Sequence, residues 1–218
     1  TRVPEDQLDS VLFIAVDQLF RGADVISSRD EIIRLTHLAL RAGDRAMANS
    51  AYLPASLYLL QAIGLLEESD WTNHYDLTLH LYSSAAETCY VLGNFEVLNE
   101  LAKETLAKAA CLQDKIRIYF SLSNSLASQG KMLDAIDFGL GVLEQLGESL
   151  PPNLDDDEVI AKYVMETSIM MRDIEVNDII QKAAMQDEAK QTAMQFISTM
   201  AMHSYLDRPK ACPVISAR

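Results

Sequence analysis

The sequence predicts an all-α fold built from antiparallel helix hairpins. Along most of its 218 residues, apolar side chains recur at intervals of three and four, which places them on one face of a helix. The strand and turn breakers are few, with eight Gly and six Pro. Hydrophobic residues make up 49% of the chain, enough for a sizeable core and too many for a disordered chain. We therefore expect amphipathic helices joined by short turns.

The first two predicted helices have well-marked boundaries. The first spans Glu5–Phe20, and the second begins after Ser28 and runs to about Asn49. Ser28 and Glu31 have the spacing of a capping box, in which each side chain accepts a hydrogen bond from a free amide of the other's backbone. Gly43 lies inside the second helix, where it costs about 1 kcal/mol relative to Ala. We therefore expect a neighbouring helix to pass close to it.

Five more helices are predicted before residue 147. The third has Pro54 in its first turn, where the missing N–H does no harm. Gly93, Gly130 and Gly147 each end one of these helices, because Gly readily adopts the left-handed conformation that stops a helix. The third helix carries Leu57, Leu60, Leu65 and Leu66, and the spans predicted for the next four are about Asn73–Leu92, Phe95–Ala110, Leu112–Gln129 and Met132–Leu146.

The last third of the chain begins with a linker, Leu150–Asn153, that contains two prolines. Asp155–Glu158 then begins the next helix, where negative charge suits the helix dipole. This acidic run lacks the ligand spacing of a calcium loop. Two further helices are expected near Ile174–Met185 and Asp187–Tyr205. We expect a leading helix and loop at 1–27, hairpins at 28–147, and C-terminal helices that continue the stack at 148–218.

A degenerate repeat relates three of the predicted turns, at Ser50, Gly93 and Gly130. Small residues tend to occupy equivalent positions around each turn. Seven residues before the turns lie Gly43, Ala86 and Ser123; five residues after them lie Ala55, Leu98 and Ala135; and twelve residues after them lie Ala62, Thr105 and Val142. The intervals of 43 and 37 residues are near the ~34 of tetratricopeptide units and the ~40 of longer helical repeats. The pattern favours a tetratricopeptide-like superhelix, with an ordinary helical bundle as the alternative.

Several further stretches form a recognisable pattern, and they are Leu38–Ala55 with Tyr58–Leu66, Trp71 with Tyr75–Leu79, Ala85–Glu87, Gly93–Glu96, Asp114–Tyr119, and Glu144–Gly147 with Leu150-Pro151. Together they resemble a helical region of large multidomain signalling kinases. Val16–Gly22 is also similar to the start of that region, with Phe20 where Asn is usual. The resemblance implies a scaffold beside an AAA-like STAND ATPase module, with GAF, histidine kinase or Ser/Thr kinase domains elsewhere in the parent protein.

The formal net charge of −14 argues against binding to nucleic acid or to anionic lipid. Three well-separated cysteines predict neither a zinc site nor a disulfide framework and fit a reducing compartment. No apolar run is long enough to span a membrane. We expect a cytoplasmic chain. It lacks an initiator Met and stops where a new helix would begin, so we also expect a piece of a longer protein.

Few residues suggest chemistry. His74, Asp76 and His80 could suggest a metal, but the two histidines are six residues apart and point to different sides of a helix, so a polar helix edge is favoured. We interpret Cys89 as a small buried apolar residue and Trp71 as a packing anchor. Seven methionines lie in the last third; filling core gaps is favoured over a surface for partner helices. They are Met165, Met170, Met171, Met185, Met194, Met200 and Met202.

We expect a non-catalytic scaffold for protein–protein or interdomain contacts, without a cofactor or metal. It would be a regulatory segment of a larger ATPase or signalling kinase, or alternatively a free-standing tetratricopeptide-like adaptor. An independent hydrolase is a third option, but no activated nucleophile or carboxylate pair supports it. The predicted contact residues are polar positions on the first helix of each pair, namely Arg41, Arg45, Asn49, Asn73, His80, Ser83, Glu87, Arg117, Ser121 and Asn124.

Overall fold

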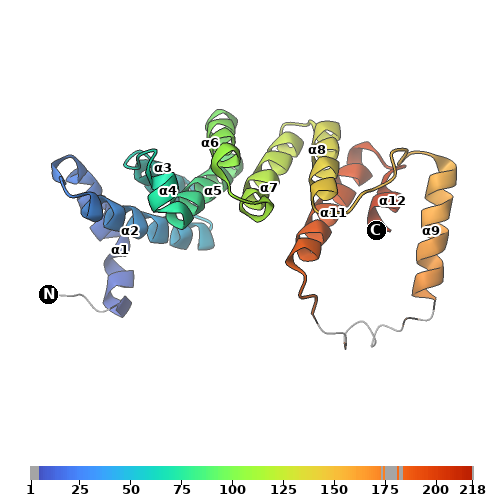
Figure 1. Ribbon diagram of the computed structural model, residues 1–218, viewed down its shortest axis with the longest axis horizontal. Helices are drawn as coiled ribbons and strands as arrows, with labels where there is room; N and C mark the ends of the chain where they lie inside the picture. The colour runs from blue at the N-terminus through green and yellow to red at the C-terminus, as the bar shows by residue number, and fades with distance from the viewer. Residues whose placement is uncertain (1–4, 173, 175–180, 182–183, 218) are drawn as a thin grey trace. The chain divides into compact units, whose positions relative to one another are not determined.

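The computed structural model describes residues 5–172, 174, 181 and 184–217, with side chains described from residue 11 onward, and confirms the all-α prediction (Figure 1). Every element in these residues is a helix. In chain order they are α1 (Glu5–Arg21), the 3₁₀ helix η1 (Ala23–Val25), α2 (Arg29–Ala48), α3 (Tyr52–Ile63), α4 (Asp70–Asn73), α5 (Tyr75–Val91), α6 (Phe95–Lys108), α7 (Leu112–Ser128), α8 (Met132–Gln145), α9 (Asp157–Met171), α11 (Glu188–Asp207) and α12 (Cys212–Ser216).

The chain forms two compact units, Thr1–Leu122 and Ser123–Arg218. In the first unit α1 packs on α2, α2 on α3, α3 on α5, and α5 on α6. The fully buried side chains at its centre include Leu12, Leu59, Leu81, Leu98 and Ile118. Most apolar positions of these helices thus face the core, although Val11, Leu19 and Leu57 are exposed. The predicted domain boundaries at residues 27 and 147 stay a prediction.

Four helices end in the same left-handed turn. The φ angles of Ser50, Gly93, Gly130 and Gly147 are 58°, 73°, 75° and 82°. In each case the next amide bonds to a carbonyl five residues back, as in Asn94 N to Cys89 O at 2.8 Å, and the turn residue's own amide bonds three residues back. This hydrogen-bond pair is the Schellman motif. The three glycine stops and the equivalence of Ser50 to Gly93 and Gly130 are confirmed.

The repeat positions are buried as predicted. A Cβ added to Gly43 would lie 2.7 Å from both Cγ and Cδ2 of Leu59, so α2 and α3 cross closely at this point. The other members are at most 2% exposed, and they are Ala55, Ala62, Ala86, Leu98, Thr105, Ser123, Ala135 and Val142. Small residues therefore let helix backbones approach where the sequence pattern indicated.

Two helix starts differ from the prediction. The prediction of capping-box hydrogen bonds at Ser28 is wrong. Ser28 is the N-cap residue of α2, but its side chain makes no capping hydrogen bond. Its carbonyl instead accepts the amides of Glu31 and Ile32, both at 3.1 Å. The predicted helix at Asn73–Leu92 is broken at His74, whose φ and ψ of −137° and 45° are not helical, so α4 and α5 are separate helices.

Trp71 is the packing anchor that its position predicted. The residue is 6% exposed, and its indole N–H donates to Oε1 of Glu104 on α6 at 2.9 Å. The hydroxyl of Tyr82 donates to the same oxygen at 2.9 Å, with the two ring centroids 4.9 Å apart. One carboxylate thus joins α4, α5 and α6. Cys89 is a free, fully buried thiol, and burial raises its pKa.

In the second unit α8 and α12 pack on α11, and α9 packs on α12. The expectation that the late methionines fill the core is wrong for all but Met200. Met200 is fully buried, and its thioether occupies the space that a side chain at Gly139 would need. The other six are 46–70% exposed. One glycine on α8 makes room for one methionine, and the remaining methionines face away from the core.

The acidic run before α9 is a helix cap, as predicted. Oδ1 of Asp156 accepts the amides of Glu158 and Val159 at 2.8 and 3.4 Å. Asp155 pairs with Arg208 at 2.7 Å. The predicted helix near Ile174–Met185 lies mostly outside the described residues. Among the helices that are described, none combines the length and apolar character needed to cross a membrane.

Candidate functional site

A polar network joins three helices of the first unit, and each of them is followed by a left-handed turn. Asp44 lies on α2, His80, Ser84 and Glu87 on α5, and Arg117 on α7. Nε2 of His80 is 3.4 Å from Oδ2 of Asp44, and the Ser84 hydroxyl is 3.4 Å from Oδ1. Arg117 donates to the Ser84 hydroxyl at 3.1 Å and to Oε2 of Glu87 at 3.0 Å. The contacts run without a break from α2 through α5 to α7.

A groove of about 230 Å³ opens beside this network, and we call it the α5–α7 groove. Its lining comes from α5 (Asp76, Leu79, His80 and Ser83) and α7 (Gln113, Asp114 and Arg117). On α5, Leu79 and His80 both lie three or four residues from Asp76 and from Ser83. On α7, Gln113 and Asp114 lie four and three residues before Arg117, so each set falls on one helix face. The groove is thus built on rigid helices, with side chains from both.

Ser83 is unusual among the residues that line the groove. It is only 2% exposed, and among the described residues its hydroxyl has no hydrogen-bond partner. Its neighbour Ser84 is fully buried but bonded to both Asp44 and Arg117. In the described residues the buried side-chain atoms without a partner are Ser123 Oγ and His203 Nδ1, and the Ser83 hydroxyl is not one of them. It is therefore accessible from the groove that Ser83 lines, where a polar group of an incoming segment can bond to it.

Asp114 is held in place at one end of the groove. Its Oδ2 accepts the Tyr75 hydroxyl at 2.5 Å and the Cys111 amide at 3.3 Å. The Tyr75 oxygen also accepts the Ala110 amide at 2.8 Å, which ties down the turn between α6 and α7. The Tyr75 hydrogen bond lowers the pKa of Asp114, so its carboxylate stays charged. Burial and the same hydrogen bond raise the pKa of Tyr75.

The structure brings four of the ten predicted contact residues together. His80, Ser83 and Arg117 line the groove, and Glu87 is the ion-pair partner of Arg117 at its edge. Ser121 is 4% exposed, and its hydroxyl is committed to the Arg117 carbonyl at 3.0 Å, so it does not face a partner.

The remaining five predicted residues do not line the groove. Arg41, Arg45 and Asn49 lie on or just after α2; Arg45 and Asn49 are exposed, and the two arginines make further contacts of their own. Asn73 is exposed at the end of α4. Asn124 is on α7 but belongs to the second unit.

Sequence reasoning missed six residues of the network and groove: Asp44, Asp76, Leu79, Ser84, Gln113 and Asp114. Asp76 could have been found, because it stands seven residues before Ser83 and therefore on the same helix face. The others needed the three-dimensional arrangement. Asp44 and Ser84 are forty residues apart in the sequence and meet only through the packing of α2 against α5.

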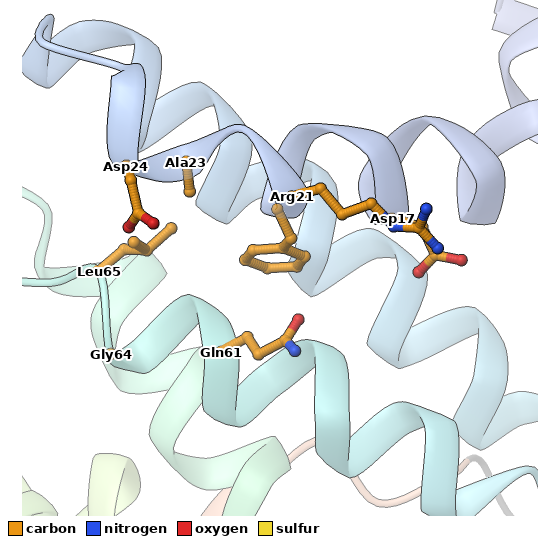
Figure 2. Close-up of a pocket in the computed structure, with 8 residues that line it drawn as sticks. Asp17, Arg21, Ala23, Asp24, Gln61, Gly64 and Leu65 are labelled. Atoms are coloured by element: carbon orange, nitrogen blue, oxygen red, sulfur yellow. The ribbon is translucent and has the colours of Figure 1, made fainter.

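A larger cleft, of about 580 Å³, lies between α1, η1 and the end of α3 (Figure 2). The Arg21 side chain extends along α1 toward Asp17, and Gln61 and Leu65 face it from α3 and the following turn (Figure 2). Asp17, Arg21 and Asp24 are all exposed, so the cleft is an open surface feature. No buried polar group is directed into it, and it is the weaker candidate.

The histidines considered for metal binding are not arranged around an ion. His80 faces Asp44 on α2. Within the part of the chain that the structure describes, no group of three or more His, Cys, Asp or Glu side chains could hold a metal.

Comparison with known proteins gives a weak but relevant similarity. The chain is 23% identical over 161 residues to the hybrid signal transduction histidine kinase G of Dictyostelium discoideum. That match covers 70% of this chain but 5% of the kinase. No family model and no solved structure matches the chain. The similarity relates this helical region to a signalling kinase.

Proposed function

We propose that this chain is a non-catalytic, tetratricopeptide-like scaffold that binds a protein segment in the α5–α7 groove. The segment belongs either to a separate partner or to another domain of the same polypeptide. In this proposal the chain is a regulatory part of a larger signalling protein with ATPase or kinase domains. The scaffold itself carries out no reaction and needs no cofactor.

The observation that carries the proposal is the polar network with its adjoining groove. Asp44, Ser84 and Arg117 come from three different helices, and their contacts fix the relative positions of α2, α5 and α7 on one side of the unit. Except for Leu79, the side chains that line the groove are polar, and except for Ser83 they are at least partly exposed, whereas the opposite faces of the same helices contribute to the core. A rigid, polar, concave surface of this kind suits recognition of an extended segment.

Four equivalent left-handed turns support the tetratricopeptide-like part of the proposal, since each returns the chain after a helix of similar length. The similarity to a hybrid histidine kinase supports the signalling context. Regulation would follow from mass action: a segment that binds one arrangement of the parent protein more tightly than another shifts the balance between them.

Site-specific photocrosslinking tests the proposal. A photoreactive amino acid replaces Gln113, which lines the groove, or Asn99, an exposed residue of α6 outside it. Each variant is produced in cells of the source organism and irradiated, and cross-linked peptides are identified by mass spectrometry. We expect Gln113 to cross-link to one defined protein segment, and Arg117→Ala in the same chain to reduce the yield.

The two positions give a clear contrast. If Gln113 yields no more cross-linked product than Asn99, or if the product is unchanged by Arg117→Ala and His80→Ala, then the groove is not a protein-contact site. Circular dichroism of each variant establishes that the helices remain folded.

A further inference from the structure

We infer that the α5–α7 groove takes the basic side chain of a lysine or arginine, an inference that rests on the proposed function. The groove provides carboxylates at one end, an apolar wall in its middle and a hydroxyl without a partner. Each of these three features matches one part of a long cationic side chain.

The charge around the groove is the first argument. Asp44, Asp76, Glu87 and Asp114 are four carboxylates of the network and groove, and Arg117 supplies the guanidinium in the groove lining. Arg117 is already engaged by Glu87 and Ser84. Asp76 has no ion-pair partner among the described residues and lies with Asp114 in the lining of the groove. An incoming cation therefore meets Asp76, which is in no ion pair among the described residues, and Asp114, whose Oδ2 accepts hydrogen bonds from neutral groups only.

The size and lining of the groove supply the second argument. Its volume of about 230 Å³ is below the ~300 Å³ at which pockets for drug-sized molecules begin, so it suits a single side chain. Leu79 is half-buried and offers an apolar surface to an aliphatic stem. The Ser83 hydroxyl has no hydrogen-bond partner among the described residues and is accessible from the groove, so it can donate a hydrogen bond to the segment that carries the side chain or accept one from it.

An acidic occupant is disfavoured by the same contacts. To reach Arg117, an incoming carboxylate would have to replace Glu87 at 3.0 Å and lie close to Asp76 and Asp114. Like charges at short range raise the free energy of such a complex. The groove is therefore expected to prefer a basic side chain because its carboxylates attract a cation and repel an anion.

Nuclear magnetic resonance titration of the ¹⁵N-labelled 218-residue chain tests the inference. The probes are three five-residue peptides, acetyl-Ala-Ala-X-Ala-Ala-amide, in which X is lysine, norleucine or glutamate. Norleucine keeps the aliphatic stem and removes the charge. We expect the lysine peptide to shift the amides of Leu79, Ser83 and Gln113, with a Kd about tenfold lower than that of the norleucine peptide, equivalent to about 1.4 kcal/mol.

Variants assign the effect to the groove. Asp76→Asn removes one charge without changing size and should raise the Kd of the lysine peptide about threefold or more. Ser83→Leu should abolish the shifts by filling the groove. Asp137→Asn, which removes an exposed carboxylate from α8 in the second unit, is the matched control and should change nothing.

The outcomes separate this inference from the proposed function. The inference is overturned if the norleucine or glutamate peptide binds the groove as tightly as the lysine peptide, or if Asp76→Asn and Asp137→Asn behave alike. It is also overturned if no peptide shifts the groove amides while Gln113 still cross-links to a protein segment, in which case the proposed function stands. Failure of the cross-linking as well removes both.

Discussion

The close crossing at Gly43 makes a quantitative prediction about Gly43→Ala. The new methyl group would lie 2.7 Å from Cγ and Cδ2 of Leu59, a distance at which one of the two helices must shift. Leu59 is fully buried and cannot rotate away into solvent. Overpacking of this kind costs about 1–3 kcal/mol. The better helix propensity of Ala returns about 1 kcal/mol, so we expect a net loss of about 1 kcal/mol.

Gly141→Ala is the matched comparison. Gly141 also lies inside a helix, α8, but a Cβ added there meets no atom within 4 Å. Only the propensity gain applies, so this variant should be about 1 kcal/mol more stable than the parent chain. The stability of both variants is measured by urea unfolding followed by circular dichroism. Amide hydrogen exchange in α2 and in α8 gives a local readout for each helix.

A double substitution isolates the contact itself. Leu59→Ala alone should cost about 2–5 kcal/mol because it leaves a cavity. In that background, Gly43→Ala places a methyl group in the vacated space, so its effect should change from destabilising to stabilising, by about 1 kcal/mol. Equal effects of Gly43→Ala in both backgrounds, or a gain as large as that of Gly141→Ala in the parent, would refute the close crossing of α2 and α3.

Three further predictions concern a turn, a buried histidine and the end of the groove. Ser50→Gly should raise the free energy of unfolding in urea by about 0.5–1 kcal/mol. A left-handed conformation costs a residue other than Gly about 1–2 kcal/mol, and the greater freedom of Gly in the unfolded chain offsets part of this gain. A lower free energy of unfolding for Ser50→Gly would contradict the prediction. His203 is 7% exposed, its Nδ1 has no partner, and burial lowers its pKa. The unfolded chain then binds more protons below about pH 6.5, so stability should fall as the pH falls through the folded pKa, and His203→Gln should flatten this dependence in thermal unfolding. Tyr75→Phe should raise the pKa of Asp114 toward its ordinary value in a carboxyl resonance titration, and an unchanged value would show that Tyr75 is not the cause.

The helix stops were predictable because they depend on one residue's backbone. Gly93, Gly130 and Gly147 adopt a conformation that L side chains rarely tolerate, and their type alone indicates it. The burial of the repeat positions was predictable for a similar reason, since small residues at fixed distances from a turn lie where two helices meet. Ser50 was recognised only by comparison with the glycines, since Ser at a left-handed turn has no strong signature of its own.

The features that sequence reasoning missed depend on contacts between helices and on the local backbone, which residue type and spacing do not specify. Ser28 has the residue type and spacing of a cap, but its own backbone carbonyl already accepts the Glu31 amide that its side chain would have bonded. The exposure of Met170 or Met202 is set by how far α9 and α11 are covered, which spacing along one helix does not reveal. The groove depends on the distance between α5 and α7, so Asp114 could be placed on a helix but not opposite Ser83.

The position of Trp71 has a practical consequence for how this protein is studied. It is the chain's single tryptophan, and it lies within the first unit, packed on Tyr82 and bonded to Glu104. Intrinsic fluorescence excited at the indole therefore reports the first unit alone, whereas far-ultraviolet ellipticity averages the helices of both units. When both signals are recorded over one denaturant series, the fluorescence midpoint reports unfolding of the first unit and the ellipticity midpoint reports unfolding of both. The difference between the two unfolding midpoints then indicates how cooperatively the two units unfold.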